Sequence, residues 1–207
     1  MTQVISFQAK GDFISGRFVP VEKGDGEFKD ISPADLTDHI MTVKFKYDHV
    51  DEACQAAKKA FLPWAKLSID ERKKYLLRLK EVFDTHAEQM AQLIARDTGK
   101  ALWASLTEAK NLGNKIDITL NHSLQLIKEN HLENVLPGVE GVIRYKARGV
   151  MAILGPFNFP AHLPNGHLVP ALIAGNTVVF KPSEQTPAVG QFMAELIEKV
   201  GFPPGVF

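Results

Sequence analysis

Two short segments of the sequence combine residue types that suit chemistry at the end of a strand. The first is Gly155-Pro-Phe-Asn-Phe-Pro160, which follows a continuous apolar run. The Asn158 side chain carries two amide N–H donors, and such donors stabilise the negative oxygen that forms when a carbonyl is attacked. The alternative is that Asn158 only turns the chain or caps the next helix, as Asn does in many loops.

The second segment is Lys181-Pro-Ser-Glu184, which also follows an apolar, β-branched run. A lysine and a glutamate three residues apart can both reach the hydroxyls of one ribose. A glutamate at the 2′-hydroxyl repels a 2′-phosphate, so this pair favours NAD over NADP. The alternative is a salt-bridged pair at the start of a helix.

Other patterns that carry chemistry are weak in this sequence. No G-x-G-x-x-G follows the first apolar run and no P-loop occurs, so the glycine pattern alone predicts no dinucleotide site. His162 and His167 have no further ligands at metal spacing, so we expect no metal site. Cys54 recurs at helical spacing with small apolar residues, which predicts a packed side chain rather than a nucleophile.

The elements that must position the two segments form an α/β pattern. Val150–Leu154 is typical of a strand covered on both faces, and Thr177–Lys181 is a second strand. A helix that ends near Ala174 separates them. The two strands begin 27 residues apart, close to the roughly 30 expected for one right-handed βαβ unit. A further helix is predicted over 189–200.

The preceding part of the chain is predicted to contain short strands and then helices. A strand pair or a bend is predicted over 13–19. A loop over 21–38 and a half-buried strand over 41–45 follow. Residues 48–130 show helical periodicity. Residues 142–148 alternate apolar and basic side chains, which predicts a strand with one solvated face.

Cap signals divide the helical region into separate helices. Asp48 is predicted to cap the first helix, which should end near Pro63 because the proline ring blocks continuation. Ser68 and Glu71 form a capping box at the start of the second helix. Gly99 suits the C-terminal cap of the third.

Composition and charge exclude several classes of protein. Lys plus Arg and Asp plus Glu number 24 each, so the net charge is zero and no overall attraction to nucleic acid or to an acidic membrane is expected. No apolar stretch approaches the roughly 18 residues that span a membrane, and we expect no leader peptide at the N-terminus. The single cysteine fits a reducing compartment, and we expect a cytoplasmic protein.

Three segments of the chain together resemble the NAD(P)-dependent aldehyde dehydrogenase superfamily: 155–160, 175–184 and 201–206. The stretch 158–175 is most similar to the succinylglutamate-semialdehyde dehydrogenases of arginine breakdown. The resemblance covers nearly the whole chain and is most specific from Gly149 onward. It departs at Phe157, where that subfamily more often has Tyr, and at Ala161, which replaces a Gly.

The resemblance implies roles for individual residues. In the family a cysteine attacks the aldehyde, an Asn side chain and a backbone N–H hold the oxyanion, hydride passes to nicotinamide, and a glutamate activates water. The match carries the oxyanion role onto Asn158. It implies NAD contacts at Leu154, Pro156, Phe157, Lys181, Ser183 and Glu184. It implies an aldehyde tunnel lined by Phe159, Leu163 and Gly166.

The fold implied is α/β, a partial aldehyde dehydrogenase fold in which N-terminal strands and helices lead into the first half of a Rossmann-like parallel sheet. Residues 1–136 should form those strands and the helical part of the cofactor-binding domain. Residues 137–149 should form a strand of the oligomerisation platform, and 150–207 the first two βα units of the NAD-binding domain. We expect a homo-oligomer in the full-length protein.

The expected function follows from what the chain matches and what it lacks. No residue matches the family's catalytic cysteine or general-base glutamate. We therefore expect a truncated, N-terminal portion of an NAD-dependent enzyme that oxidises a small-molecule semialdehyde, N-succinylglutamate 5-semialdehyde, and expect this chain to be inactive alone. The alternative is a naturally short, non-catalytic interaction module that pairs with partners through an unpaired sheet edge.

Overall fold

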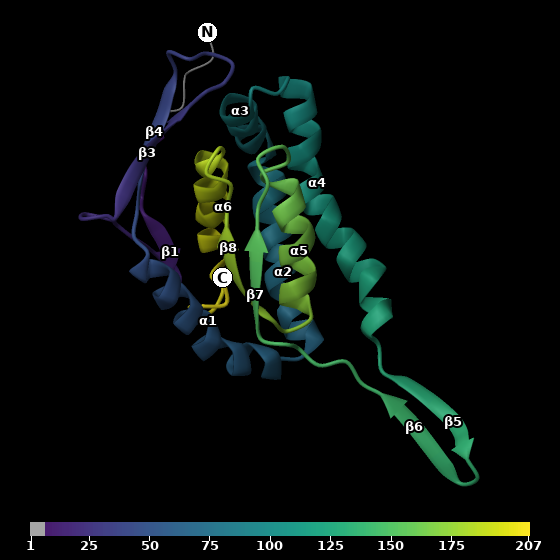
Figure 1. The fold of residues 1–207 in the computed structure, drawn as a ribbon. Coiled ribbons are helices and arrows are strands. Elements are labelled where there is room, and N and C mark those ends of the chain that lie inside the picture. The colour runs from purple at the N-terminus through teal and green to yellow at the C-terminus, as the bar shows by residue number, and fades with distance from the viewer. Residues whose placement is uncertain (1–6) are drawn as a thin grey trace.

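The computed structural model describes residues 7–207 as a mixed α/β body from which one hairpin projects (Figure 1). The strands are β1 (Asp12–Ile14), β2 (Arg17–Val19), β3 (Gly26–Ile31), β4 (His39–Phe45), β5 (Asn130–Leu136), β6 (Val139–Ile143), β7 (Val150–Leu154) and β8 (Thr177–Lys181). The helices are α1 (Asp48–Lys66), α2 (Ile69–Thr85), α3 (Ala87–Thr98), α4 (Leu102–Asn121), α5 (His162–Ile173) and α6 (Pro187–Val200), with a short 3₁₀ helix η1 (Ser123–Ile127) after α4.

Two antiparallel hairpins open the described chain. β1 pairs with β2 across Ser15 and Gly16, whose φ angles of +54° and +79° fit a tight turn, and this confirms the predicted strand pair. β3 pairs with β4, so the prediction of a loop throughout 21–38 is wrong at β3. That strand places Glu27 and Lys29 on its exposed face. These charged residues made a half-buried strand resemble a loop in composition.

Cap signals located the start of α2 and the end of α3. Ser68 and Glu71 form the predicted capping box, in which the Glu71 N–H donates to Ser68 Oγ at 3.2 Å and the Ser68 N–H donates to Glu71 Oε2 at 2.7 Å. Gly99 ends α3 with a φ of +73°, also as predicted. The predictions for α1 are wrong, because Asp48 is its first residue rather than its cap and the helix continues through Pro63.

The Arg72 guanidinium supports the last turn of α1 beyond Pro63. It is buried, and its Nε donates to the Ile173 carbonyl at the end of α5 at 2.9 Å. Burial lowers the pKa of Arg72, whereas the partial negative charge at a helix C-terminus favours the cation. Further bonds join its Nη1 to carbonyls near the end of α1, those of Trp64, Ala65 and Leu67.

β5 and β6 form an antiparallel hairpin that extends away from the body (Figure 1). The sequence predicted helical structure up to residue 130 and a strand over 142–148. Both predictions are wrong in part. β5 begins at Asn130, where a helix was predicted, and residues 144–148 connect β6 to β7 outside any strand. Every side chain of β5 is exposed, so no buried face marked this strand in the sequence.

β7 and β8 form the predicted parallel pair, with α5 as the crossover. The register pairs Val150 with Thr177 and Leu154 with Lys181. Within residues 7–207 this parallel sheet has two strands, so the extended Rossmann-like sheet is not seen there. Only Ile153 of β7 is buried, and the expectation of a strand covered on both faces is therefore wrong for β7.

The hydrophobic core lies between this strand pair and the helices. α2 contacts α4, α5 and α6, and its side chains Leu76, Leu79 and Phe83 are buried at the centre of the cluster. Trp64 of α1 is also buried and donates its indole N–H to the Leu172 carbonyl at 3.0 Å. Burial of these large side chains supplies the main stabilisation of the body.

Asn176 joins the beginnings of β7 and β8. This buried side chain accepts hydrogen bonds through Oδ1 from the Arg148 N–H at 2.7 Å and the Gly149 N–H at 3.1 Å. Its Nδ2 donates to the Ala171 carbonyl at 3.2 Å. One amide therefore sets where the two strands enter the sheet, and hence where their other ends emerge.

Candidate functional site

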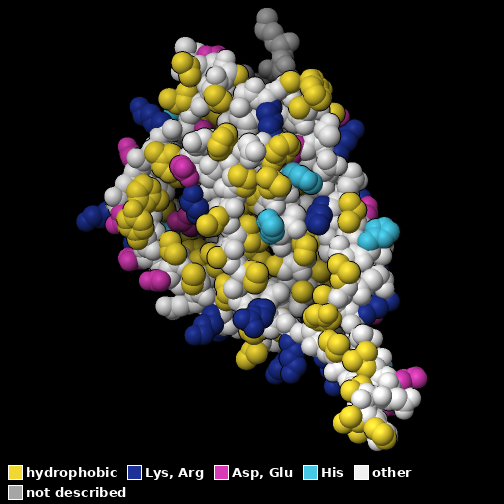
Figure 2. Space-filling view, turned by 45° about the vertical axis from the view of Figure 1, so that its right-hand side comes forward, with side chains coloured by type: hydrophobic (Ala, Val, Ile, Leu, Met, Phe, Trp, Pro, Cys, Tyr) yellow, Lys and Arg dark blue, Asp and Glu magenta, His cyan; other side chains and the backbone are white. Residues whose placement is uncertain are grey.

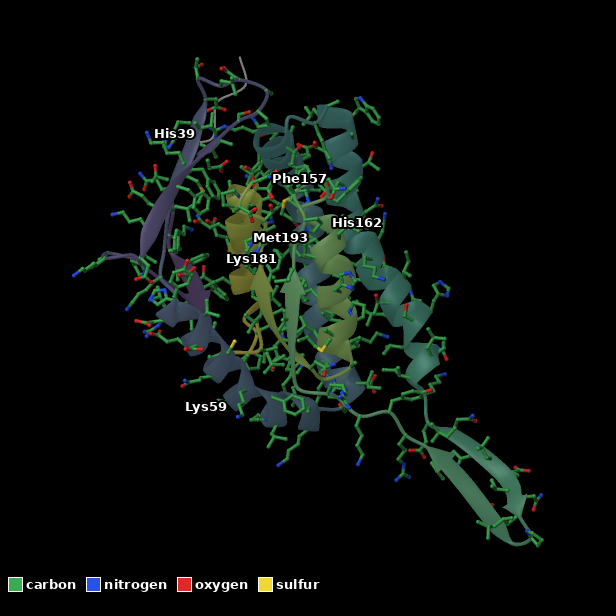
Figure 3. All side chains as sticks on the ribbon, viewed as in Figure 1. His39, Lys59, Phe157, His162, Lys181 and Met193 are labelled. Atoms are coloured by element: carbon green, nitrogen blue, oxygen red, sulfur yellow. The ribbon has the colours of Figure 1, made fainter. Side chains whose placement is uncertain are left out.

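The turn after β7 and the turn after β8 lie side by side at the carboxyl ends of the two strands (Figure 3). The Gly155 N–H donates to the Lys181 carbonyl at 2.9 Å, which ties one turn to the other. A Cβ at Gly155 would lie 2.9 Å from Phe180 and 3.1 Å from Pro164, so the close approach requires glycine. Carboxyl ends of parallel strands are where open α/β sheets bind ligands.

Asn158 lies in the turn between β7 and α5, with its side chain exposed. In the described part of the chain no hydrogen bond engages its amide. The cap residue of α5 is Ala161, and no side chain of the turn caps the helix, so the reading of Asn158 as a helix cap is not supported. Its two N–H donors are therefore available to a ligand.

Two charged residues outside the turns hold the Asn158 turn in place, and the sequence analysis did not identify them. Glu108 of α4 accepts hydrogen bonds through Oε1 from the Ala161 N–H at 3.1 Å and the His162 N–H at 3.2 Å. Its Oε2 accepts a hydrogen bond from Lys100 Nζ at 2.7 Å. One signal in the sequence could have identified Glu108, because it is an acidic residue among the buried positions of α4. A buried position rarely carries a charge unless that charge is paired.

Apolar residues flank Asn158 along the chain, in its turn and in α5. Gly166 lies on α5, where an added Cβ would meet no atom within 4 Å. Pro156 is half-buried in the turn. Figure 2 shows hydrophobic side chains spread over the face that carries α5. Four of them near the turn are at least 40% exposed: Leu154, Phe157, Phe159 and Leu163. An amide donor beside exposed apolar side chains suits a small, weakly polar ligand group.

Lys181 and Glu184 form the salt bridge that the alternative interpretation predicted, with 2.8 Å between Nζ and Oε2. Both side chains are more than half exposed, at 60% and 65%, so the pair remains accessible to a ligand. The hydrogen bond from Lys181 holds the pKa of Glu184 below its usual range. Ser183 lies between these two residues in the sequence, and its side chain is buried. The Ser183 Oγ accepts a hydrogen bond from the Gln185 N–H at 3.2 Å.

The second turn packs tightly against the start of α6. A Cβ at Gly190 would lie 2.4 Å from the Pro182 Cβ, so only glycine allows this approach. Pro187 occupies the first turn of α6, where a missing N–H costs nothing. The turn therefore lies at a helix N-terminus, whose partial positive charge favours anionic groups.

Cys54 is exposed on α1, so the expectation of a packed side chain is wrong. α1 lies near the amino end of β8, where Thr177 Oγ1 donates to the Ala57 carbonyl at 2.9 Å. Asn158 follows the opposite, carboxyl end of the sheet. Within residues 7–207 no group of three or more His, Cys, Asp or Glu side chains is arranged to hold a metal ion. None of the described helices is long and apolar enough to cross a membrane.

The sequence of this chain matches one family of known proteins. The aldehyde dehydrogenase family profile matches residues 19–207. N-succinylglutamate 5-semialdehyde dehydrogenase of Vibrio cholerae serotype O1 is 47% identical over 159 residues, which are 77% of this chain and 32% of that protein. N-succinylglutamate 5-semialdehyde dehydrogenase 2 of Caulobacter vibrioides is 47% identical over 157 residues, 76% of this chain and 32% of that protein. The chain thus spans about a third of the length of these relatives.

Solved structures give the same result. Methylmalonate-semialdehyde dehydrogenase from Oceanimonas doudoroffii has a TM-score of 0.88 at 27% identity, covering 97% of this chain and 40% of that one. Aldehyde dehydrogenase C from Pseudomonas syringae, solved with NAD⁺ and octanal, has a TM-score of 0.83 at 27% identity, covering 94% of this chain and 39% of that one. With the profile match over most of its length, this chain belongs to the aldehyde dehydrogenase family.

Proposed function

We propose that this chain is the N-terminal portion of an NAD-dependent aldehyde dehydrogenase of the cytoplasm that oxidises a semialdehyde to a carboxylate. The observation that carries the proposal is the exposed amide of Asn158 at the carboxyl end of β7, beside the turn with Lys181 and Glu184. Among the described residues this amide has no hydrogen-bond partner. The relatives in V. cholerae and C. vibrioides are named for N-succinylglutamate 5-semialdehyde. We propose the same substrate here, in arginine breakdown.

Asn158 serves the reaction as a hydrogen-bond donor. Its Nδ2–H binds the aldehyde oxygen and stabilises the negative charge that develops there during attack at the carbonyl carbon. Phe159 and Leu163 flank the amide and exclude water from the aldehyde. Gly166 leaves room for a long substrate beside them. The nucleophile is not Cys54, which lies near the other end of the strands.

The second turn fits a dinucleotide. Lys181 offers a donor and Glu184 an acceptor to the hydroxyls of a ribose, and both are exposed. The cofactor wall is completed by Leu154, Pro156, Phe157 and Ser183. NAD, when bound, takes up the hydride that the substrate loses. A carboxylate at Glu184 repels a 2′-phosphate, so the proposal is for NAD rather than NADP.

We also propose that the full-length protein is a homo-oligomer and that the segment 137–149 contributes to the subunit contact. The β5–β6 hairpin carries exposed apolar side chains, visible along the projecting arm in Figure 2. Among them are Leu132, Val135, Leu136, Val139 and Ile143. Exposed apolar side chains of this extent are typical of surfaces that bind another protein.

The proposed function is tested with the full-length protein from the source organism. We expect NADH formation with N-succinylglutamate 5-semialdehyde, and none from the 207-residue chain alone. Asn158→Ala in the full-length protein should lower kcat by about 100- to 1,000-fold, as removal of an oxyanion donor does. Asn114→Ala, on the exposed face of α4, is the matched control and should leave kcat unchanged. A full-length protein without this activity would refute the proposal.

A second candidate is the naturally short, non-catalytic interaction module. The exposed side chains of β7 and of the β5–β6 hairpin favour it, because both surfaces offer apolar contacts to a partner. The intact mass of the protein isolated from its source distinguishes the two. A mass more than about twice the 22.9 kDa of this chain supports the enzyme, and a mass of 22.9 kDa supports the interaction module.

A further inference from the structure

Glu108 is a fully buried carboxylate whose two oxygens are both engaged. Its side chain is 0% exposed, and Oε2 lies 2.7 Å from Lys100 Nζ. Oε1 accepts hydrogen bonds from the backbone N–H groups of Ala161 and His162, at 3.1 and 3.2 Å. A buried charge is tolerated only when it is paired and hydrogen-bonded in this way. The carboxylate therefore has one arrangement available to it.

These contacts fix the start of α5 from outside the helix. The first N–H groups of a helix lack partners within it, and no side chain of the Asn158 turn supplies one. Glu108 does so from α4, 53 residues away in sequence from Ala161. The partial positive charge of the helix N-terminus also favours the carboxylate. The position of α5 relative to α4 is therefore set at the point where the Asn158 turn ends.

Lys100 extends the same contact to the residue after Asn158. Its Nζ lies 3.8 Å from the centroid of the Phe159 ring, within the range of a cation–π contact. Lys100 thus touches Phe159 on one side and Glu108 on the other. At its other end the turn is tied to β8 by the hydrogen bond from the Gly155 N–H to the Lys181 carbonyl. The turn is held at both ends, while no partner within residues 7–207 binds the Asn158 amide.

We propose that the Lys100–Glu108 pair is a positioning device for the Asn158 amide, holding the turn so that Nδ2 stays aimed at the developing oxyanion. The inference rests on the proposed aldehyde oxidation. Neither residue touches the reacting atoms, so both act through Asn158. A small displacement of a donor is costly because stabilisation of an oxyanion depends on donors that are already in place.

The test uses the full-length protein and kinetics with the aldehyde and NAD. Glu108→Gln keeps an oxygen for the two N–H groups but places an amide beside the Lys100 ammonium. We expect kcat to fall by about 10- to 100-fold with little change in the KM for NAD. Lys100→Met should act in the same direction, and Lys100→Arg should restore most of the rate. Lys80→Met removes ion pairs to Asp84 and Asp117, neither of which contacts the Asn158 turn, and is the control.

A double-mutant cycle separates positioning from general support of the fold. In the Asn158→Ala background, Glu108→Gln should change kcat less than about twofold, because its effect has already been lost with the amide. A multiplicative loss in the double mutant would overturn the positioning role. So would an unchanged kcat in both Glu108→Gln and Lys100→Met.

Failure of the proposed function has a different signature. If the unmodified full-length protein oxidises no aldehyde, or if Asn158→Ala alone leaves kcat unchanged, the oxyanion role falls and the positioning role falls with it. Hydrogen exchange still tests the contact between Glu108 and the start of α5 in that case. Exchange at the Ala161 and His162 amides should accelerate in Glu108→Ala and stay slow in Glu108→Gln, since Gln retains the acceptor.

Discussion

The Oδ2 atom of Asp97 accepts a hydrogen bond from the Val189 backbone N–H at 2.9 Å, which joins the end of α3 to the first turn of α6. The other oxygen, Oδ1, is buried, as is Oδ2 of Asp30 on β3, and no donor in residues 7–207 reaches either atom. The two carboxyl groups are close enough for each to affect the pKa of the other. Because a carboxylate only accepts hydrogen bonds, a proton on one of the two groups is the donor that the pair lacks.

This carboxyl pair should make the stability of the chain fall as pH rises. Burial raises the pKa of Asp30 to about 6 and that of Asp97 to about 8, and the neighbouring Arg96 and His39 lower that of Asp30. A raised folded-state pKa contributes stability that is fully present below the unfolded-state value of 3.8 and is lost as pH rises through the folded-state value. We therefore expect the free energy of unfolding to drop by roughly 2 kcal/mol or more as pH rises through 6 and 8. Denaturant titrations at a series of pH values measure this change in the free energy of unfolding.

Asp97→Asn should remove most of that pH dependence. The Asn side chain retains an oxygen for the Val189 N–H and supplies an amide donor to Asp30, so no proton is needed between them. The variant should be more stable than the wild type at pH 8. Asp51→Asn, on the exposed surface of α1, is the matched control and should leave the profile unchanged. If the free energy of unfolding of Asp97→Asn falls with pH as steeply as that of the wild type, the carboxyl pair is not the source of the pH dependence.

Arg72→Met should destabilise the chain by about 2 to 4 kcal/mol. The guanidinium is 7% exposed and donates to the Ile173 carbonyl at 2.9 Å as well as to carbonyls at the end of α1. Its removal leaves buried acceptors at two helix ends without a donor. Arg78→Met, on the exposed side of the same helix, should cost less than about 0.5 kcal/mol. Equal losses in the two variants, measured by denaturant unfolding, would show that the buried contacts add nothing.

Asn176→Ala should loosen the strand pair from its amino end. The substitution removes the acceptor of the Arg148 and Gly149 N–H groups and the donor to Ala171. We expect a loss of about 2 to 3 kcal/mol. Hydrogen exchange should accelerate in β7 and β8 before it does in α2. Asn114→Ala, which loses one exposed side-chain contact, serves as the comparison, and matching exchange profiles would argue against this role.

The βαβ part of the fold was predictable because its signals are local. Two β-branched runs, a helix between them and glycines at the turns fix β7, α5 and β8 with few alternatives. The same holds for the capping box at Ser68 and Glu71. β3 and β5 were missed because their signals depend on partners. Each carries polar residues at exposed positions, and only pairing with the next strand shows them to be extended.

The site was predictable in part for the same reason. The sequence shows polar residues at the ends of two strands, namely Asn158, Lys181 and Glu184. The parallel register brings those strand ends together. Glu108 could not be assigned from the sequence, because its role depends on a contact with Ala161 across 53 residues. The end of α1 was mispredicted for a similar reason. Arg72, which lies on the next helix, supports the turn beyond Pro63.

Glu184→Gln in the full-length protein should shift coenzyme preference toward NADP. Oε2 of Glu184 lies 2.8 Å from Lys181 Nζ, and the hydrogen bond from Lys181 keeps the pKa of the carboxyl below its usual range. The group is therefore ionised at neutral pH and opposes a 2′-phosphate. With a neutral amide in its place, Lys181 is left to attract that phosphate. The ratio of kcat/KM for NADP over NAD should rise by about tenfold or more.

Two matched variants make this last prediction specific. Glu198→Gln removes an exposed carboxylate near the far end of α6 and should leave the coenzyme ratio unchanged, because it lies away from the β8 turn. Lys181→Met removes the cation and should weaken both coenzymes, with the larger loss for NADP. If Glu184→Gln lowers the rates with NAD and NADP equally, the carboxylate does not discriminate at the 2′ position. The salt bridge with Lys181 would then be its whole role.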